Sequence, residues 1–322
     1  MTGDYRRFAL TRAGQAIVVV LLAYVFTFLI ISVLPGDAIT NTLRDPQHGL
    51  SEEDIQRIVA FYGLDQPVII QLLLSLARFL TGELGFSLQS NLPVSQLVGD
   101  ALPSTLTLAT TALFIAIIFA VAIAYGAQYL PGKWAAIVRS IPSFFLSVPN
   151  FVIGLVLIEF FAFRLHSFTT TDPNSPVATL FAAITLAIPV SAPLAEVLIA
   201  SLDHESRQEY AVVARSRGLT EARLFAKHLV KPSALPSVAM VALIVGELLG
   251  GSVITETIFG RDGIGTVVQK AVTGEDQPVL QAIVSLSAVV FVAVNLVADL
   301  ASPLLDPRVK LRETKFKEKV GA

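Results

Sequence analysis

Six long apolar segments, each nearly free of charged residues, recur along the chain. A transmembrane helix needs about 20 apolar residues, because each residue rises about 1.5 Å and the hydrocarbon core is about 30 Å thick. Glycine and proline inside the segments blur their ends, but membrane helices tolerate both residues. The pattern therefore predicts six transmembrane helices, at residues 13–36, 101–132, 140–158, 173–195, 232–255 and 277–298.

The composition agrees with burial in lipid. Hydrophobic residues make up 54% of the chain and charged residues 15%, whereas soluble domains average about 25% charged residues. One water-soluble core of this size cannot cover so much apolar surface. The net charge of −2 argues against a nucleic-acid partner, and the absence of cysteine excludes disulfides and Cys-ligated metal sites. We therefore expect an all-α integral membrane protein.

Lysine and arginine predict the orientation of the chain in the membrane. With the N-terminus inside, the cytoplasmic segments hold 17 of the 23 basic residues. Both termini, residues 1–12 and the basic tail 303–322, are therefore predicted to be cytoplasmic. The apolar segment 13–36 is about twice the length of a signal-peptide core and no A-x-A site follows, so we expect an uncleaved first helix.

The extracytoplasmic loop 37–100 is too long to be a simple connector. Acidic residues follow Ser51, apolar residues then recur at helical spacing, and Gly63 suits a helix end, which together predict one helix. The 14 residues 67–80 are too short to span the membrane and predict an amphipathic helix along the outer membrane face or against the bundle. The alternative is a small outer cap with no role in transport.

The cytoplasmic loop 201–235 is the most informative segment. Its pattern predicts two short helices broken at Gly218, which can adopt the positive φ that ends the first, while Thr220 and Glu221 can cap the second. A rigid, charged elbow between membrane helices is suited to receive a push from a soluble partner. The alternative is a solvated loop that only follows the positive-inside rule.

Enzyme motifs are absent from the sequence. The nearest match to a phosphate-binding loop, residues 126–134, has five residues between its glycines instead of four, and Trp134 replaces the required Ser or Thr. The four histidines form no H-E-x-x-H motif, and no G-x-S-x-G motif stands out. We therefore expect no catalytic residues, no metal site, and no ATP bound by this chain itself.

Residues 209–220 read Glu-Tyr-Ala-Val-Val-Ala-Arg-Ser-Arg-Gly-Leu-Thr, with His228 and Leu235-Pro236 downstream. This segment resembles the coupling loop of ABC importer permeases, although Val212-Val213-Ala214 replaces the Glu-Ala-Ala of the wider superfamily. Further segments follow in the order typical of the B-type permeases of the oligopeptide, dipeptide and nickel import family. These segments are residues 34–37, 62–67, 82–85, 93–95, 102–106, 250–259, 263–265, 295–299 and 304–308. The ordered set resembles that family almost from end to end.

The resemblance implies a type I importer permease of six helices in a bacterial inner (plasma) membrane. Its partners would be a second related permease, two cytoplasmic subunits that bind ATP and Mg²⁺, and an extracytoplasmic substrate-binding protein. Residues 101–322 would form the permease core, with the elbow contacting the ATPases. The residues that the resemblance assigns to this contact are Glu209, Tyr210, Ala214, Arg215, Arg217, Gly218 and Leu219.

Carboxylates inside the predicted helices should face protein or water, since burial in lipid costs about 2.5–3.5 kcal/mol. Glu247 is the best candidate for lining a pathway, together with the neighbouring Gly250, Gly251 and Ser252. Glu159, Glu196 and Asp299 lie near helix ends, where an interfacial position or pairing with an arginine is the simpler interpretation. The spacing Gly246-x-x-x-Gly250-Gly251 predicts close helix packing, within the bundle or at a seam between two permeases.

Three functions therefore compete. The first is the permease subunit of an ATP-driven importer, for oligopeptides or dipeptides, or alternatively for nickel or another small solute. The second is a proton-coupled secondary transporter that uses the intramembrane carboxylates, although such carriers often show inverted repeats and none is seen here. The third, a membrane-embedded enzyme, is disfavoured by the missing motifs.

Overall fold

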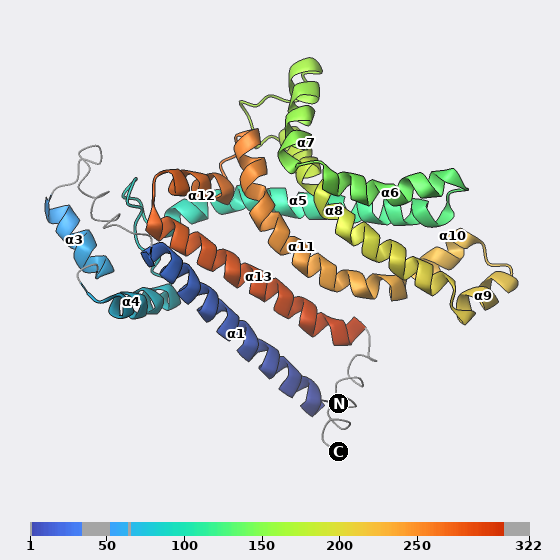
Figure 1. Cartoon of the computed structure of the whole chain (residues 1–322), viewed down its shortest axis with the longest axis horizontal. Helices are drawn as coiled ribbons and strands as arrows, with labels where there is room; N and C mark the ends of the chain where they lie inside the picture. The colour runs from blue at the N-terminus through green and yellow to red at the C-terminus, as the bar shows by residue number, and fades with distance from the viewer. Residues whose placement is uncertain (1, 34–51, 64–65, 306–322) are drawn as a thin grey trace.

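The computed structural model describes residues 2–33, 52–63 and 66–305, and this part of the chain is built from helices (Figure 1). The first half contains α1 (Thr2–Val33), α3 (Glu52–Tyr62), α4 (Val68–Thr81), α5 (Val94–Tyr129), α6 (Lys133–Ser147), α7 (Asn150–Leu157) and the π-helix η2 (Ile158–Arg164). The second half contains α8 (Pro176–Ser206), α9 (Glu209–Ser216), α10 (Glu221–Leu224), the π-helix η3 (Phe225–Leu229), α11 (Val230–Phe259), α12 (Ile264–Thr273) and α13 (Gln277–Leu305). One end of the bundle carries α9 and α10 and is called the elbow end (Figure 1). The opposite end carries α3, α4 and α12 and is called the α12 end.

Each of the six predicted apolar segments is mostly helical where the structure describes it, with residues 34–36 of the first outside the described part, but they do not all form straight helices. Among the described residues, α1, α5, α8, α11 and α13 each contain a stretch long and apolar enough to cross a membrane. The third predicted segment, 140–158, is instead divided between α6 and α7, which meet at 98°. The chain turns at Val148 and Pro149, whose backbones are extended, because the residue before a proline avoids the helical conformation. The bent pair counts as a sixth span only when both helices are taken together.

Small residues allow the central helices to pack closely. Ala112, Ala116 and Ala120 recur every four residues along one face of α5 and are fully buried. Buried alanines of α8 join them in the largest hydrophobic cluster. Side chains of this size bring helix axes close together, as in other membrane helix pairs. Helix α1, by contrast, is mostly exposed and packs along α13.

Both helices predicted between the first two spans are present. Helix α3 ends at Gly63 (φ +64°), as its sequence predicts, and buries Ile55 against Leu88. Helix α4 ends at Gly82 (φ +83°), and its hydroxyl-bearing Ser75 lies 2.5 Å from the Tyr24 hydroxyl of α1. The predicted N-cap Ser51 lies outside the described residues.

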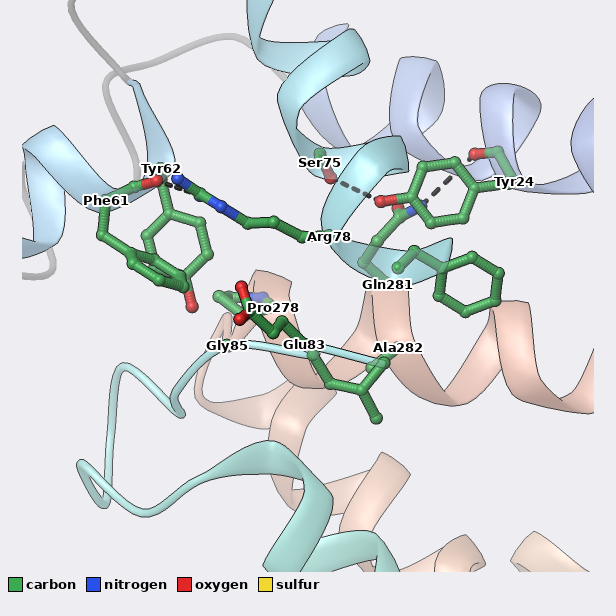
Figure 2. A pocket seen from close by; sticks show the side chains of 12 residues that line it. Tyr24, Phe61, Tyr62, Ser75, Arg78, Glu83, Gly85, Pro278, Gln281 and Ala282 are labelled. Carbon is green, nitrogen blue, oxygen red and sulfur yellow. Dashed lines mark hydrogen bonds between the residues drawn. The ribbon is translucent and has the colours of Figure 1, made fainter. Parts of the chain in front are cut away.

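The segment between α4 and α5 is tied to the start of α13. Ser87 Oγ donates to Asp276 Oδ2 (2.5 Å) and the Leu88 backbone N–H donates to Asp276 Oδ1 (3.2 Å). Figure 2 shows the small cavity beside this attachment, about 60 Å³ in volume, where Tyr24, Arg78 and Gln281 approach from α1, α4 and α13. The Arg78 guanidinium lies 4.0 Å from the centre of the Phe61 ring, and burial raises the pKa of Tyr62 to about 12. These contacts join α3 and α4 to the α12 end of the bundle.

Candidate functional site

The predicted elbow is present and is broken at the predicted residue. Helix α9 ends at Ser216, Gly218 has a φ of +81°, and α10 begins at Glu221. A Cβ atom placed on Gly218 would meet nothing within 4 Å. Glycine is therefore required there by the left-handed backbone and not by lack of space. Thr220 precedes α10 with an extended backbone, but its side chain makes no capping hydrogen bond, so this part of the predicted cap is not formed.

Arg215 joins three parts of the elbow. Its Nε donates to Glu221 Oε1 (2.8 Å), its Nη2 to Glu221 Oε2 (3.4 Å), and its Nη1 to the Ser206 carbonyl at the end of α8 (2.8 Å). The pKa of Arg215 is raised, chiefly by the hydrogen bonds to Glu221. Because the pair is partly exposed, it contributes at most about 1 kcal/mol to stability. Its geometric effect is to fix the angle between α9 and α10.

The inner face of the elbow is seated on the bundle. Ala211 of α9, Leu224 of α10 and Leu229 of η3 are fully buried. They form one cluster with Ala124 of α5 and Leu202 of α8. The elbow is therefore a packed part of the bundle and not a solvated loop.

The outer face of the elbow presents both charged and apolar side chains. Tyr210 donates a hydrogen bond to Glu205 Oε2 (2.6 Å), and burial followed by this bond raises its pKa. Val212 and Val213 are also exposed, and sequence reasoning did not select them. Their signal was the departure from Glu-Ala-Ala, in which Val212 replaces the charged Glu and Val213 replaces a small Ala. Of the residues predicted at this site, Glu209, Tyr210, Arg217 and Gly218 are exposed, and Ala214, Arg215 and Leu219 are half-buried.

The four pathway candidates on α11 do not share one face. Glu247 and Gly250 are exposed and fall on one stripe with Leu243 and Ile254, at spacings of three and four residues. Ser252 is buried, and a Cβ atom on Gly251 would lie 2.9 Å from Leu186 Cδ1. Ser252 and Gly251 therefore face the bundle, whereas Glu247 and Gly250 face away from it.

Two of the three carboxylates near predicted helix ends form ion pairs. Asp299 lies 3.5 Å from Arg12 and Glu159 lies 3.3 Å from Arg164, and both pairs are exposed. This agrees with the simpler interpretation of pairing with an arginine. Glu196 is exposed.

Sequence reasoning missed a buried polar cluster at the α12 end. Glu256, Arg261 and Thr105 are each at most 2% exposed. They lie in or beside three of the segments that resemble the permease family, but periodicity within a helix cannot show that these residues meet in space. The Gly263-x-Gly265 spacing was the available signal, because paired glycines often mark a close approach of the backbone.

Comparison with known proteins decides the family. Residues 112–311 match the family of binding-protein-dependent transport system inner membrane components. The chain belongs to this family. It is thus the permease component of a binding-protein-dependent ABC importer, as the sequence resemblance predicted, and a multi-pass protein of the inner membrane.

Individual relatives cover nearly the whole permease. A peptide transport system permease of Brucella abortus is 31% identical over 94% of this chain and 98% of its own length. A glutathione transport system permease of Salmonella choleraesuis is 29% identical over 95% of this chain and 99% of its own length. A crystal structure of an amino acid ABC transporter with histidines has 18% identity and a TM-score of 0.44, covering 68% of this chain and 94% of that one.

Proposed function

We propose that this permease imports peptides and forms half of a translocation pathway that separate ATPase subunits open and close through the elbow. The observation that carries the proposal is the packed, glycine-broken elbow, with its exposed outer face, in a chain of this family. The partners are a second related permease, two cytoplasmic subunits that hold ATP and Mg²⁺, and an extracytoplasmic binding protein.

A continuous helical path supports the coupling role. Helix α10 runs through η3 directly into α11, so residues 221–259 are helical without interruption. The Arg215–Glu221 contact fixes α9 to the start of this path. A displacement of α9 by an ATPase would therefore be passed along α11 to the stripe that contains Glu247 and Gly250. Tyr210, Val212 and Val213 would form the surface that the ATPase contacts.

The distribution of basic residues supports the orientation. The elbow end is cytoplasmic, with both chain termini, and the α12 end is extracytoplasmic. Helix α4 then lies at the outer membrane face, where α3 and α4 elaborate the first extracytoplasmic segment. This proposal places the elbow on the side where ATP is available.

Peptides are the proposed substrates because similar permeases are named for peptide and glutathione transport. Glu247, exposed on α11, would meet the amino group of a peptide that passes along the stripe. The binding protein would select the particular peptide.

The coupling role is tested by comparing two glycines with the same backbone strain. Gly218 and Gly82 both have a φ above +80°, and a Cβ atom placed on either would meet nothing within 4 Å. Replacing either with alanine costs about 1–2 kcal/mol of local strain. We expect Gly218→Ala to reduce ATP-dependent peptide uptake by reconstituted importer at least about tenfold, with the permease still inserted, because the angle of the elbow changes. Gly82→Ala, at the opposite end, should retain most of the uptake. Equal uptake by both variants would contradict the role of the elbow.

A further inference from the structure

Glu256 occupies a fully buried position at the end of α11 and binds two other elements. Its Oε1 accepts a hydrogen bond from Thr105 Oγ1 of α5 (2.7 Å), and its Oε2 accepts one from the Gly265 backbone N–H (2.6 Å). Thr105 Oγ1 in turn accepts from the Ile264 backbone N–H (2.8 Å). One carboxylate and one hydroxyl therefore hold two of the free N–H groups at the start of α12.

The electrostatics of this contact are favourable. The start of a helix carries a partial positive charge and backbone N–H groups without intrahelical partners, so a carboxylate there is stabilised. A buried carboxylate without such partners would carry a large desolvation cost. Glu256 is thus compensated by α12 and Thr105, and losing either would leave buried polar groups unsatisfied.

The glycines of the segment 263–265 make the contact possible. Gly260 (φ +68°) ends α11 and turns the chain back toward the helix. A Cβ atom on Gly263 would collide with the Glu256 carboxylate, and one on Gly265 would lie 2.5 Å from Val253 Cα and 2.7 Å from Glu256 Oε2. Any larger residue would push the start of α12 away from Glu256.

Arg261 forms a second buried joint beside the first. Its Nη1 donates to the Thr179 hydroxyl of α8 (2.7 Å) and to the Pro173 carbonyl (2.6 Å), and its Nη2 donates to Ser104 Oγ of α5 (3.2 Å). Ser104 and Thr105 are neighbours, so adjacent residues of α5 serve both joints. Side chains therefore connect the N-terminal parts of α5 and α8 with the end of α11 and the start of α12.

We propose that Glu256 and Thr105 are positioning residues for transport, which hold α12 rigidly to α5 and α11 so that these elements move as one unit when the pathway changes state. The exposed stripe of α11 ends near Ile254, and Glu256 follows two residues later on the opposite, buried face of the helix. The joint therefore holds the end of the helix that carries the stripe. This inference rests on the proposed function, because it assigns the joint a part in the import cycle.

Thr105 allows a matched test. Thr105→Val keeps the shape of the side chain and removes the hydroxyl, whereas Thr105→Ser keeps the hydroxyl that bridges Glu256 and Ile264. Each variant would be assembled with its partner permease, ATPases and binding protein in lipid nanodiscs. Hydrogen exchange of residues 261–274 reports on the joint itself. The ATPase rate with and without the binding protein, and uptake of radiolabelled alanine dipeptides and tripeptides into proteoliposomes, report on its role.

For Thr105→Val we expect exchange at the start of α12 to be about tenfold faster, which corresponds to about 1.4 kcal/mol. We also expect a loss of at least about tenfold in binding-protein-stimulated ATPase activity and in uptake, with the basal ATPase rate unchanged. Thr105→Ser should restore both. If Thr105 only positions α12, the substitution lowers the binding-protein-stimulated ATPase rate alone. A general loss of folding would lower the basal ATPase rate as well.

Three results would overturn the inference. Unchanged exchange in Thr105→Val would show that the joint does not hold α12. Faster exchange with full stimulation and uptake would show that the joint is only structural, and an equal fall in the basal rate would show general destabilisation. Failure of the wild-type assembly to import any peptide with ATP would instead refute the proposed function, and with it the role of the joint in import. Hydrogen exchange would still report whether the joint itself exists.

Discussion

Three glycines on or near α11 illustrate how the same residue serves different physical purposes. Gly218 adopts a left-handed backbone, Gly246 leaves room for a neighbouring side chain, and Gly250 lies in the exposed stripe of α11 with nothing near it. A Cβ atom on Gly246 would lie 2.5 Å from Cδ2 of Phe291, on α13. Of the predicted Gly246-x-x-x-Gly250-Gly251 contact, Gly246 and Gly251 do pack closely, against Phe291 and Leu186, whereas Gly250 faces away from the described part of the bundle.

This difference predicts opposite effects of two similar substitutions. Gly246→Ala should lower stability by about 1–3 kcal/mol, because Phe291 must shift and the α11–α13 contact is overpacked. Gly250→Ala should leave stability unchanged or slightly raised, since the added methyl meets nothing and alanine favours helix. Thermal unfolding of both variants in the same detergent checks the prediction. A lower melting temperature for Gly250→Ala than for Gly246→Ala would contradict it.

At the scale of elements, local patterns identify helices reliably and bends less so. Amphipathic spacing predicts α3 and α4, and Gly63 and Gly218 predict the ends of α3 and α9, because each signal lies within a few residues of the structure it determines. The 98° bend between α6 and α7 was not predicted, although Pro149 lies there, because prolines also occur inside continuous membrane helices such as α8.

Helix α4 carries a prediction about the membrane. Ile69 of this helix is 72% exposed, and Leu73 and Leu80 are also largely exposed. If water surrounded the helix, a large apolar surface would be in contact with it, which is unfavourable. Ser75 contacts Tyr24, six residues before the end of the apolar span Tyr5–Ile30 of α1, which corresponds to a depth of about 9 Å along that helix. We therefore expect lipid to cover the exposed face of α4.

The measurement uses tryptophan fluorescence. Trp134 is the single tryptophan, so Trp134→Phe gives a silent background. Ile69→Trp in this background should be quenched strongly by lipids brominated in their acyl chains. Val212→Trp on the elbow, also an exposed position, should be quenched little. Strong quenching at residue 212 and none at residue 69 would contradict the proposed placement of both elements.

At the scale of the whole molecule, the sequence was sufficient for the class of fold and the family, and insufficient for the joints that hold the helices together. Apolar length predicts spans because lipid thickness is constant, and ordered motifs predict the family because many weak matches combine. The meeting of Thr105, Glu256 and Ile264 joins residues up to 159 positions apart. Such contacts depend on how the helices pack, which no local period encodes.

We propose that this permease is moved by ATPases belonging to other chains. The most direct measurement is peptide uptake into proteoliposomes that contain the permease pair and the ATPase subunits, with the binding protein added outside. We expect uptake to require enclosed ATP and the binding protein, and to be unaffected when a protonophore collapses the proton gradient. Uptake by the permease alone, driven by a proton gradient without ATP, would contradict it.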